Sequence, residues 1–440
     1  MLRVAGTACC LALCAAAPAW AAPSGLDPSF SADGRQMTQV GARAGGKDVA
    51  VQPDGKVVVT GTIHVNEDAV TRFGVVRYLP NGALDRSFSG DGKTAVAFGQ
   101  NQSNDARAVA LQPDGRIVVV GSTNPAQSSY DSSDVALARL RSDGQLDTSF
   151  SSDGKQTAHF GLPPVDEDGL RGASDEANDV ALQPDGRIVV AGDAEGRFAL
   201  ARLRADGALD TSFAGDGNHA STFSTSSQAY ALALAPDGKI VAAGTRRGGD
   251  SNTFALARYR ADGTLDTSFA GDGKQVTGFG EGGADAQGVA LQPDGRIVLG
   301  GSFDDTWYSG PPNVRSKFAL ARYRPDGELD TSFGAEGRQT TSFYGRDVGK
   351  DLALQGDGKI VLAGTILFAG SPPSAFGLAR YRPDGELDTS FSPSGRQVTR
   401  FGSADASGEA VTVQANGRIV VAGSADSQFA SARYLDGSGR

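Results

Sequence analysis

Residues 181–192 read Ala-Leu-Gln-Pro-Asp-Gly-Arg-Ile-Val-Val-Ala-Gly, and stretches of this kind occur seven times along the chain. The Gln-Pro-Asp-Gly marker begins at Gln183, and a β-branched run closes nine residues later at Gly192. The same spacing holds in every copy; the copies begin at Gln52, Gln112, Gln183, Ala235, Gln292, Gln355 and Gln414. A unit of roughly 60 residues repeated in this way predicts a repeat architecture.

A second marker begins at an arginine. Wherever a Leu-Asp-x-Ser-Phe motif follows, the distance from this arginine to the phenylalanine of the motif is eleven residues. The stretches between the markers vary instead. From the closing glycine to the arginine, the gap runs from ten residues (Gly192 to Arg202) to twenty-one (Gly301 to Arg322). Each unit therefore has two connections of fixed length and two of variable length.

Alternating apolar residues and β-branched content predict four strands in each unit. In the third unit they cover 179–183, 187–192, 198–203 and about 218–223. Pro-Asp-Gly between the first two strands suits a tight hairpin turn, because Pro fixes φ and Gly accepts a positive φ. Four antiparallel strands per unit at a fixed period predict an all-β fold, a seven-bladed β-propeller.

The two ends of the chain complement each other. Residues 26–30 read Leu-Asp-Pro-Ser-Phe without a preceding arginine, a strand is expected over 35–40, and the chain ends just after a third strand at Tyr434. We therefore expect the N-terminal segment to supply the outer strand of the seventh blade and to close the ring, as in WD-repeat propellers.

Residues 1–21 have a cation, an apolar stretch and an Ala-x-Ala end, which predicts a secretory signal peptide. Lipidation at Cys14 is the poorer alternative, because Leu13 is bulky. We expect residues 22–440 to form one domain, with repeats over 26–434, that is secreted or periplasmic. All three cysteines precede residue 22, so we expect neither disulfides nor Cys-based metal sites.

Composition narrows the expected partners. A formal charge of −10 without a cationic cluster argues against nucleic-acid binding. No second apolar stretch of about 18 residues follows the leader, so no membrane span is expected. We expect a monomer without a cofactor or a metal.

A charged pair recurs in every unit. The arginine of the second marker shares a strand face with large apolar residues and needs an acceptor there. The only acid present in all seven units is the aspartate of Leu-Asp-x-Ser-Phe. We interpret these residues as structural ion pairs rather than ligand-binding groups: Arg77, Arg139, Arg202, Arg258, Arg322, Arg380 and Arg433 with Asp85, Asp147, Asp210, Asp266, Asp330, Asp388 and Asp27.

Both variable connections of a four-stranded blade lie on one face of the ring, which is the candidate binding face; neutral loop drift is the alternative. The loop over 302–317 carries Trp307 and Tyr308, and Tyr130 lies in the blade 2 loop. Such aromatic residues suit sugar or peptide stacking, or pack under their own loops. The acidic loop over 163–176 suits either Ca²⁺ or plain solvation.

No residues are singled out for catalysis, since the three histidines lack a repeated partner and no carboxylate pair stands out. The favoured function is a non-enzymatic binding propeller for a glycan or an envelope protein. The alternatives are a polysaccharide lyase or glycosidase that uses loop carboxylates, and a structural envelope protein.

The unit formed by 181–192, Phe-Ala-Leu-Ala-Arg (198–202), Leu-Asp-Thr-Ser-Phe (209–213) and Gly-Asp-Gly (215–217) resembles the bacterial delta-60 repeat. The resemblance covers residues 26–434. It implies a propeller in an exported protein of unknown function, with no catalytic residues to carry over. Gln355-Gly-Asp-Gly and Gln414-Ala-Asn-Gly depart from the pattern by losing the turn proline.

Overall fold

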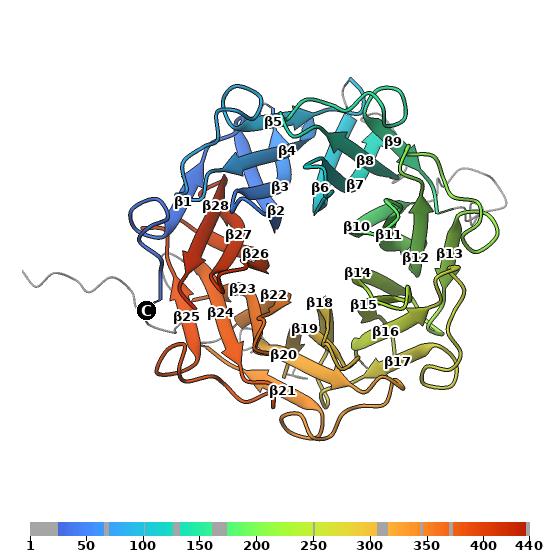
Figure 1. Cartoon of the computed structure of the whole chain (residues 1–440). Coiled ribbons are helices and arrows are strands. Elements are labelled where there is room, and N and C mark those ends of the chain that lie inside the picture. Colours follow the sequence, from blue (N-terminus) through green and yellow to red (C-terminus); the bar gives the residue numbers. More distant parts are fainter. Residues whose placement is uncertain are drawn as a thin grey trace, which may run out of the picture.

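The computed structural model describes residues 25–65, 70–100, 102–125, 133–160, 174–249, 251–305, 316–343, 346–368 and 373–436. These residues form seven antiparallel sheets of four strands each, arranged as blades around a central axis (Figure 1). The predicted seven-bladed β-propeller is confirmed. The described part of the chain contains no helix, and hence none long and apolar enough to cross a membrane.

Each blade runs from an inner strand at the axis to an outer strand at the rim. The inner strands are β2 (Arg43–Val51), β6 (Gln102–Leu111), β10 (Asp175–Leu182), β14 (Ser227–Leu234), β18 (Ala284–Leu291), β22 (Arg346–Leu354) and β26 (Ala406–Val413). The second strands are β3 (Val57–His64), β7 (Ile117–Pro125), β11 (Ile188–Ala194), β15 (Ile240–Arg246), β19 (Ile297–Asp304), β23 (Ile360–Leu367) and β27 (Ile419–Ala425).

The third strands are β4 (Thr71–Tyr78), β8 (Asp134–Leu140), β12 (Arg197–Leu203), β16 (Thr253–Tyr259), β20 (Ser316–Tyr323), β24 (Ser374–Tyr381) and β28 (Gln428–Tyr434). The outer strands are β5 (Lys93–Val96), β9 (Lys155–Ala158), β13 (Asn218–Ser221), β17 (Lys274–Thr277), β21 (Arg338–Thr341), β25 (Arg396–Thr399) and β1 (Arg35–Thr38). Blades 1 to 6 start at β2, β6, β10, β14, β18 and β22, and blade 7 combines β26, β27 and β28 with β1.

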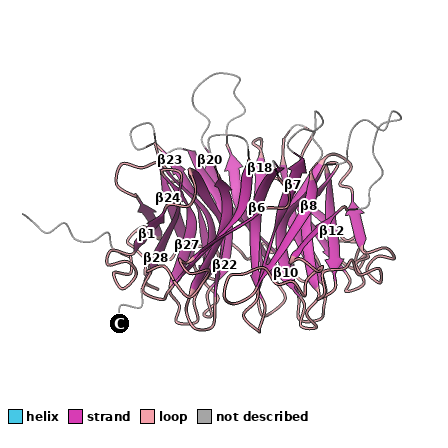
Figure 2. Cartoon of the chain, turned by 90° about the horizontal axis from the view of Figure 1, so that it is seen from above, coloured by secondary structure: helices cyan, strands magenta, loops and turns pink. Residues whose placement is uncertain are grey.

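The connections of each blade alternate between the two faces of the ring. The Pro-Asp-Gly turns lie with the third-to-outer connections on one face, and the second-to-third and outer-to-inner connections lie on the other (Figure 2). In the turn that begins at Gln52, the Gly55 amide donates to the Gln52 carbonyl and Gly55 has a φ of +83°. A positive φ at this position favours glycine over other residues.

The hydrophobic core is divided into seven clusters between neighbouring blades. One of them joins Val189 and Leu200 of blade 3 to Ile240 and Ala255 of blade 4. The buried tyrosine that ends most third strands adds a hydrogen bond to the preceding blade, as when the Tyr78 hydroxyl donates to Thr38 Oγ1 at 2.9 Å. A chain of this length is too long to bury its apolar side chains in a single core. The ring instead repeats one small interface between neighbouring blades.

The N-terminal segment closes the ring as predicted. Strand β1 pairs antiparallel with β28, in a register that runs from Arg35 opposite Ala432 to Thr38 opposite Phe429. The Asp27 amide donates to the Arg433 carbonyl at 2.8 Å, and the Phe30 side chain is fully buried in the cluster between blades 7 and 1. The first and the last described strands are thus held in one sheet.

Every inner strand carries a β-bulge at the same place. The register with the second strand shifts between Ala177 and Asp179, so Asn178 has no direct partner, and the other six blades show the same shift. A bulge of this kind bends the strand and re-aims side chains. The closing glycine of each repeat, such as Gly192, lies opposite the bulge.

The closing glycine makes room for the bulge. A Cβ added at Gly192 would lie 1.8 Å from the Glu176 carbonyl oxygen, an overlap that only a backbone shift can relieve. We expect Gly192→Ala to lower the free energy of unfolding by more than about 3 kcal/mol, the upper end of the overpacking range. Urea denaturation measures this. Gly356→Ala is the matched control, because nothing lies within 4 Å of its Cβ position. Equal stability of the two variants would contradict the packing argument.

Candidate binding site in the central channel

The seven arginines of the second marker each contact the recurring aspartate. The distance from the arginine Nε to the aspartate Oδ2 is 2.9 Å for the pair of Arg258 and 2.8 Å for the others. Six of these arginines are buried. Each guanidinium also lies 4.5 to 4.8 Å from the ring centre of the phenylalanine of its motif.

These ion pairs join neighbouring blades. The second guanidinium nitrogen of Arg77 donates to the Ser142 carbonyl in blade 2, and each of the other six arginines reaches a carbonyl of the following blade. Burial alone raises the pKa of Asp85, but hydrogen bonds from Ser87 and the charge of Arg77 outweigh it and hold this pKa below its ordinary value. The carboxylates stay ionised at neutral pH and are fully engaged within the protein.

The aromatic candidates of the variable loops, Trp307, Tyr308 and Tyr130, lie outside the described residues, as do the acids of 166–168. Two other acids of that loop are described and have partners. Asp175 is buried and accepts a hydrogen bond from the Phe160 amide at 2.9 Å, and Glu176 lies 3.0 Å from Arg107. No group of three or more potential ligands is placed to hold a metal ion within the described ranges.

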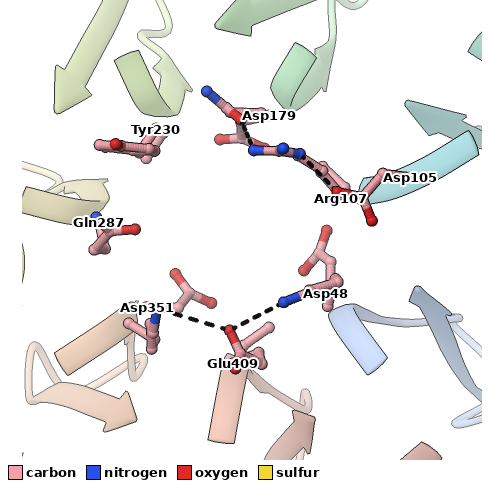
Figure 3. A pocket seen from close by; sticks show the side chains of 14 residues that line it. Asp48, Asp105, Arg107, Asp179, Tyr230, Gln287, Asp351 and Glu409 are labelled. Carbon is pink, nitrogen blue, oxygen red and sulfur yellow. Dashed lines mark hydrogen bonds and ion pairs between the residues drawn. The ribbon is translucent and has the colours of Figure 1, made fainter. Parts of the chain in front are cut away.

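The described residues offer a different site, a cavity of about 410 Å³ in the central channel. Inner strands of all seven blades line it, and Figure 3 shows their side chains converging around the axis. The unpaired bulge residue of every blade belongs to the lining. We call these seven the bulge ring: Lys47, Arg107, Asn178, Tyr230, Gln287, Lys350 and Glu409.

One half of the bulge ring is charged. The Lys47 and Lys350 ammonium groups lie 3.8 and 4.0 Å from the same carboxylate oxygen of Glu409. Arg107 is more closely held: it lies 3.0 Å from Glu176 and 3.3 Å from Asp105, and it donates to Asn178 Oδ1 at 2.8 Å. The charges of this half therefore form two groups, one across blades 6, 7 and 1 and the other across blades 2 and 3.

The other half of the bulge ring is neutral. The Tyr230 hydroxyl donates to Gln228 Oε1 at 2.5 Å and accepts from Arg247 at 3.0 Å. Burial raises the pKa of Tyr230, so its hydroxyl keeps its proton at physiological pH. Gln287 follows in the next blade and lies beside Tyr230 in Figure 3. This half presents an aromatic ring and an amide to the channel.

Three aspartates next to the bulge fasten adjacent inner strands. Oδ2 of Asp48 accepts from the Val109 amide of blade 2 at 2.7 Å, and Oδ1 accepts from the Val49 amide at 2.6 Å. Asp179 and Asp351 make the same two contacts in blades 3 and 6. In each case the next blade, whose backbone amide donates to the aspartate, has a buried alanine at the position that corresponds to that aspartate. These alanines are Ala108, Ala231 and Ala410.

Burial raises the pKa of Asp48 to about 6 and that of Asp351 to about 7, despite the hydrogen bonds from backbone amides. Asp179 has a pKa well above its ordinary value because of burial and the negative charge of Asp48. Three carboxyl groups that share one channel disfavour simultaneous ionisation. The charge of the cavity therefore changes near neutral pH.

A pH-dependent stability follows from these groups. An aspartate has a pKa near 3.9 in the unfolded chain, so between about pH 4 and 7 the folded protein binds more protons than the unfolded one. The free energy of unfolding should then fall as the pH rises from 5 to 8, by an amount of the order of a few kcal/mol. His219 opposes this trend below about pH 6.5, the ordinary pKa of a histidine, because burial lowers its pKa in the folded protein. Urea denaturation at each pH measures the slope.

The comparison for this prediction is the double variant Asp48→Asn, Asp351→Asn. It lacks two of the titrating groups, so we expect its stability to depend less steeply on pH between 5 and 8. Asp33→Asn, an exposed site, is the control. Identical slopes in the double variant and the wild type would contradict the assignment.

The bulge ring was not predicted from the sequence, although a signal for it exists. Its members stand five residues before the first marker position, from Lys47 before Gln52 to Glu409 before Gln414. Within a block that is otherwise nearly constant, this position is polar in every copy and takes six different residue types. Positions that determine the fold keep the same residue type in most copies of the repeat, whereas this position does not.

Six segments of the chain, 52–88, 112–150, 183–213, 235–269, 292–333 and 355–391, match the family described as "Domain of unknown function (DUF5122) beta-propeller". Together they make up half of the sequence. The chain belongs to this β-propeller family. No curated protein matches it.

Solved structures similar to this chain include a streptogramin B lyase, with 11% identity, a TM-score of 0.50 and coverage of 91% of this chain and 97% of that one. Sqt1 of Chaetomium thermophilum is 11% identical, with a TM-score of 0.47 and coverage of 92% and 98%. The polysaccharide lyase Uly1 is 13% identical, with a TM-score of 0.44 and coverage of 89% of each chain. At these identities the likeness to the first structure concerns the fold alone.

Proposed function

We propose that the protein is a non-enzymatic binding propeller that takes a small, hydroxyl-rich ligand of the sugar class into its central channel. The observation that carries the proposal is the bulge ring. Seven bulges at one height aim seven polar side chains into the channel, and these side chains differ in a chain that otherwise repeats itself. Diversity at a position held by a rigid scaffold is typical of binding sites.

The chemistry of the lining supports a sugar. Ammonium, guanidinium, carboxylate and amide groups line the channel, and together they supply donors and acceptors for hydroxyl groups. Tyr230 adds an aromatic ring, an apolar surface of the kind that packs against the face of a sugar. A cavity of about 410 Å³ admits a small molecule or the end of a chain, but no folded partner.

The alternative is an enzyme, a polysaccharide lyase or glycosidase. Its supporting observation is the group of carboxyl groups with raised pKa values in the channel, a pattern common at catalytic sites. The hydrogen bonds argue against it. Both oxygens of Asp48 accept from backbone amides, and the same holds for Asp179 and Asp351, so none of the three has an oxygen free of a backbone contact to exchange a proton with substrate.

We also propose that the protein is exported after cleavage near Ala21, that residues 22–440 act as a monomeric domain, and that the repeat is of the delta-60 type. The sequence of residues 1–21 and the repeat motifs support these points. The loop aromatics Trp307, Tyr308 and Tyr130 stay predicted contributors on the loop face.

Thermal melting against a panel of monosaccharides and cell-wall glycans tests the proposed function. A ligand at 100 times its dissociation constant stabilises the protein by about 2.7 kcal/mol. We expect a higher melting temperature with at least one sugar, and its loss in Tyr230→Ala but not in the outer-strand control Gln275→Ala. A wild-type protein that no sugar stabilises would contradict the proposal and favour a structural envelope protein. Release of products from a bound glycan would favour the enzyme.

A further inference from the structure

We propose that the channel binds a sugar acid, whose carboxylate lies on the channel side of Lys47 and Lys350 between their two ammonium groups. The proposal rests on the proposed function and names the ligand class for the same site. It starts from the unequal charges of the bulge ring, which contains three cations and one anion.

The surplus positive charge is localised at the two lysines. Arg107 has two acidic partners and an amide within hydrogen-bond or ion-pair distance. Lys47 and Lys350 share the single carboxylate of Glu409 at 3.8 and 4.0 Å, beyond the 2.7–2.9 Å of a charge-assisted hydrogen bond. Each ammonium has three donors. Both side chains also reach solvent, with exposed fractions of 43% and 31%.

Glu409 shows what kind of group fits between the lysines. It comes from blade 7, while the lysines come from the blades on either side, and both pair with its carboxylate. The dashed lines that meet at Glu409 in Figure 3 mark ion pairs of this carboxylate. Ser407 holds the other carboxylate oxygen through a hydrogen bond from its hydroxyl. The protein thus places a carboxylate of its own between two cations and leaves one positive charge unneutralised, which suits a monoanionic ligand group.

The rest of the ring suits the body of a sugar. Tyr230 lies across the channel from Glu409, and Gln287 stands beside it (Figure 3). A sugar acid held by its carboxylate at the lysines directs its ring and hydroxyl groups toward this neutral half, where a phenol ring and an amide are available.

Asp48 and Asp351 follow the two lysines in sequence and make the site sensitive to pH. Burial raises the pKa of Asp48 to about 6 and that of Asp351 to about 7. The other ionisable groups that line the cavity are Asp105, Arg107, Asp179, Tyr230 and Glu409, along with the two lysines. When Asp48 and Asp351 lose their protons, the surplus positive charge is cancelled, so binding of an anion should weaken from pH 5.5 to pH 8.

Ligand-observed NMR titration of the whole chain with glucuronate, glucose and glucosamine tests the inference. At pH 5.5 we expect glucuronate to bind at least tenfold more tightly than either other sugar, and more weakly at pH 8. Lys47→Met and Lys350→Met should lower the affinity for glucuronate at least tenfold and the affinity for glucose by a smaller factor, because glucose loses hydrogen-bond donors but no charge partner. Glu409→Gln should raise it, because an internal competitor is removed. Lys274→Met, on outer strand β17, should have no effect.

Two results would overturn the inference, and they differ in what else they affect. If glucose binds as tightly as glucuronate and the lysine variants bind like the wild type, selection by charge is wrong while sugar binding in the channel stands. If none of the three sugars binds to the wild type or to Glu409→Gln at either pH, the proposed binding of monomeric sugars fails together with the inference.

Discussion

Arg380→Ala should lower the free energy of unfolding by about 3–5 kcal/mol, the cost of leaving one partner of a buried ion pair alone. Only 1% of the Arg380 side chain is exposed. Its loss removes the closest cation from the buried Asp388 carboxylate, the stacking on Phe391 and the hydrogen bond to the Asp436 carbonyl of blade 7. The variant therefore loses contacts within blade 6 and across to the next blade.

Arg382→Ala is the matched control for this prediction. Arg382 is two residues away, pairs with Asp384 at 3.1 Å, and is 49% exposed, so the change should cost less than about 1 kcal/mol. Urea denaturation of both variants gives the comparison. If Arg380→Ala loses no more stability than Arg382→Ala, the recurring pairs are solvated and do not join the blades.

Removal of residues 1–41 should destabilise the ring more than any single substitution. The truncated chain loses β1, the buried Phe30 and the aspartate that pairs with Arg433. The unpaired arginine alone costs about 3–5 kcal/mol, and the lost burial of Phe30 about 1.5–3 kcal/mol. A domain of typical stability has only about 5–15 kcal/mol in total. We expect a chain that is open or largely unfolded at 25 °C.

Melting of the chain from residue 42, compared with the chain from residue 22, measures the effect of the closing strand. A peptide of residues 22–41 added in trans should raise the melting temperature of the truncated chain, because it supplies β1 and Asp27 again. A truncated chain that melts at the same temperature as the longer one would show that β1 adds nothing to closure.

The fold could be predicted because its determinants repeat. Fixed spacings marked the strands and the turns, and the unpaired Leu26-Asp27-Pro28-Ser29-Phe30 motif indicated the closing strand. Strand ends were less accurate: the fourth strand of blade 3 was predicted to reach residue 223, but β13 ends at Ser221. Phe223 instead packs against Phe198, with ring centres 4.7 Å apart.

The channel site was missed because an ideal strand alternates its faces, and a bulge breaks that rule. Lys47 and Asp48 are consecutive, yet both line the cavity. Strict alternation places only one of them there. The closing glycine of each repeat was interpreted as a strand end, whereas its role is to accept the bulge. The variable polar position in an otherwise nearly constant block is a sequence signal for the ring, and it can be seen without knowledge of the bulge.

The most direct test of the central claim, that the bulge ring is the binding site, is a variant in which all seven of its residues are replaced by alanine. The melting temperatures of this variant and of the wild type would be compared with and without the sugars of the panel. We predict that the variant keeps the β-sheet circular dichroism of the wild type and that no sugar raises its melting temperature. A variant that is stabilised by the same sugars as the wild type, by the same amount, would contradict the account.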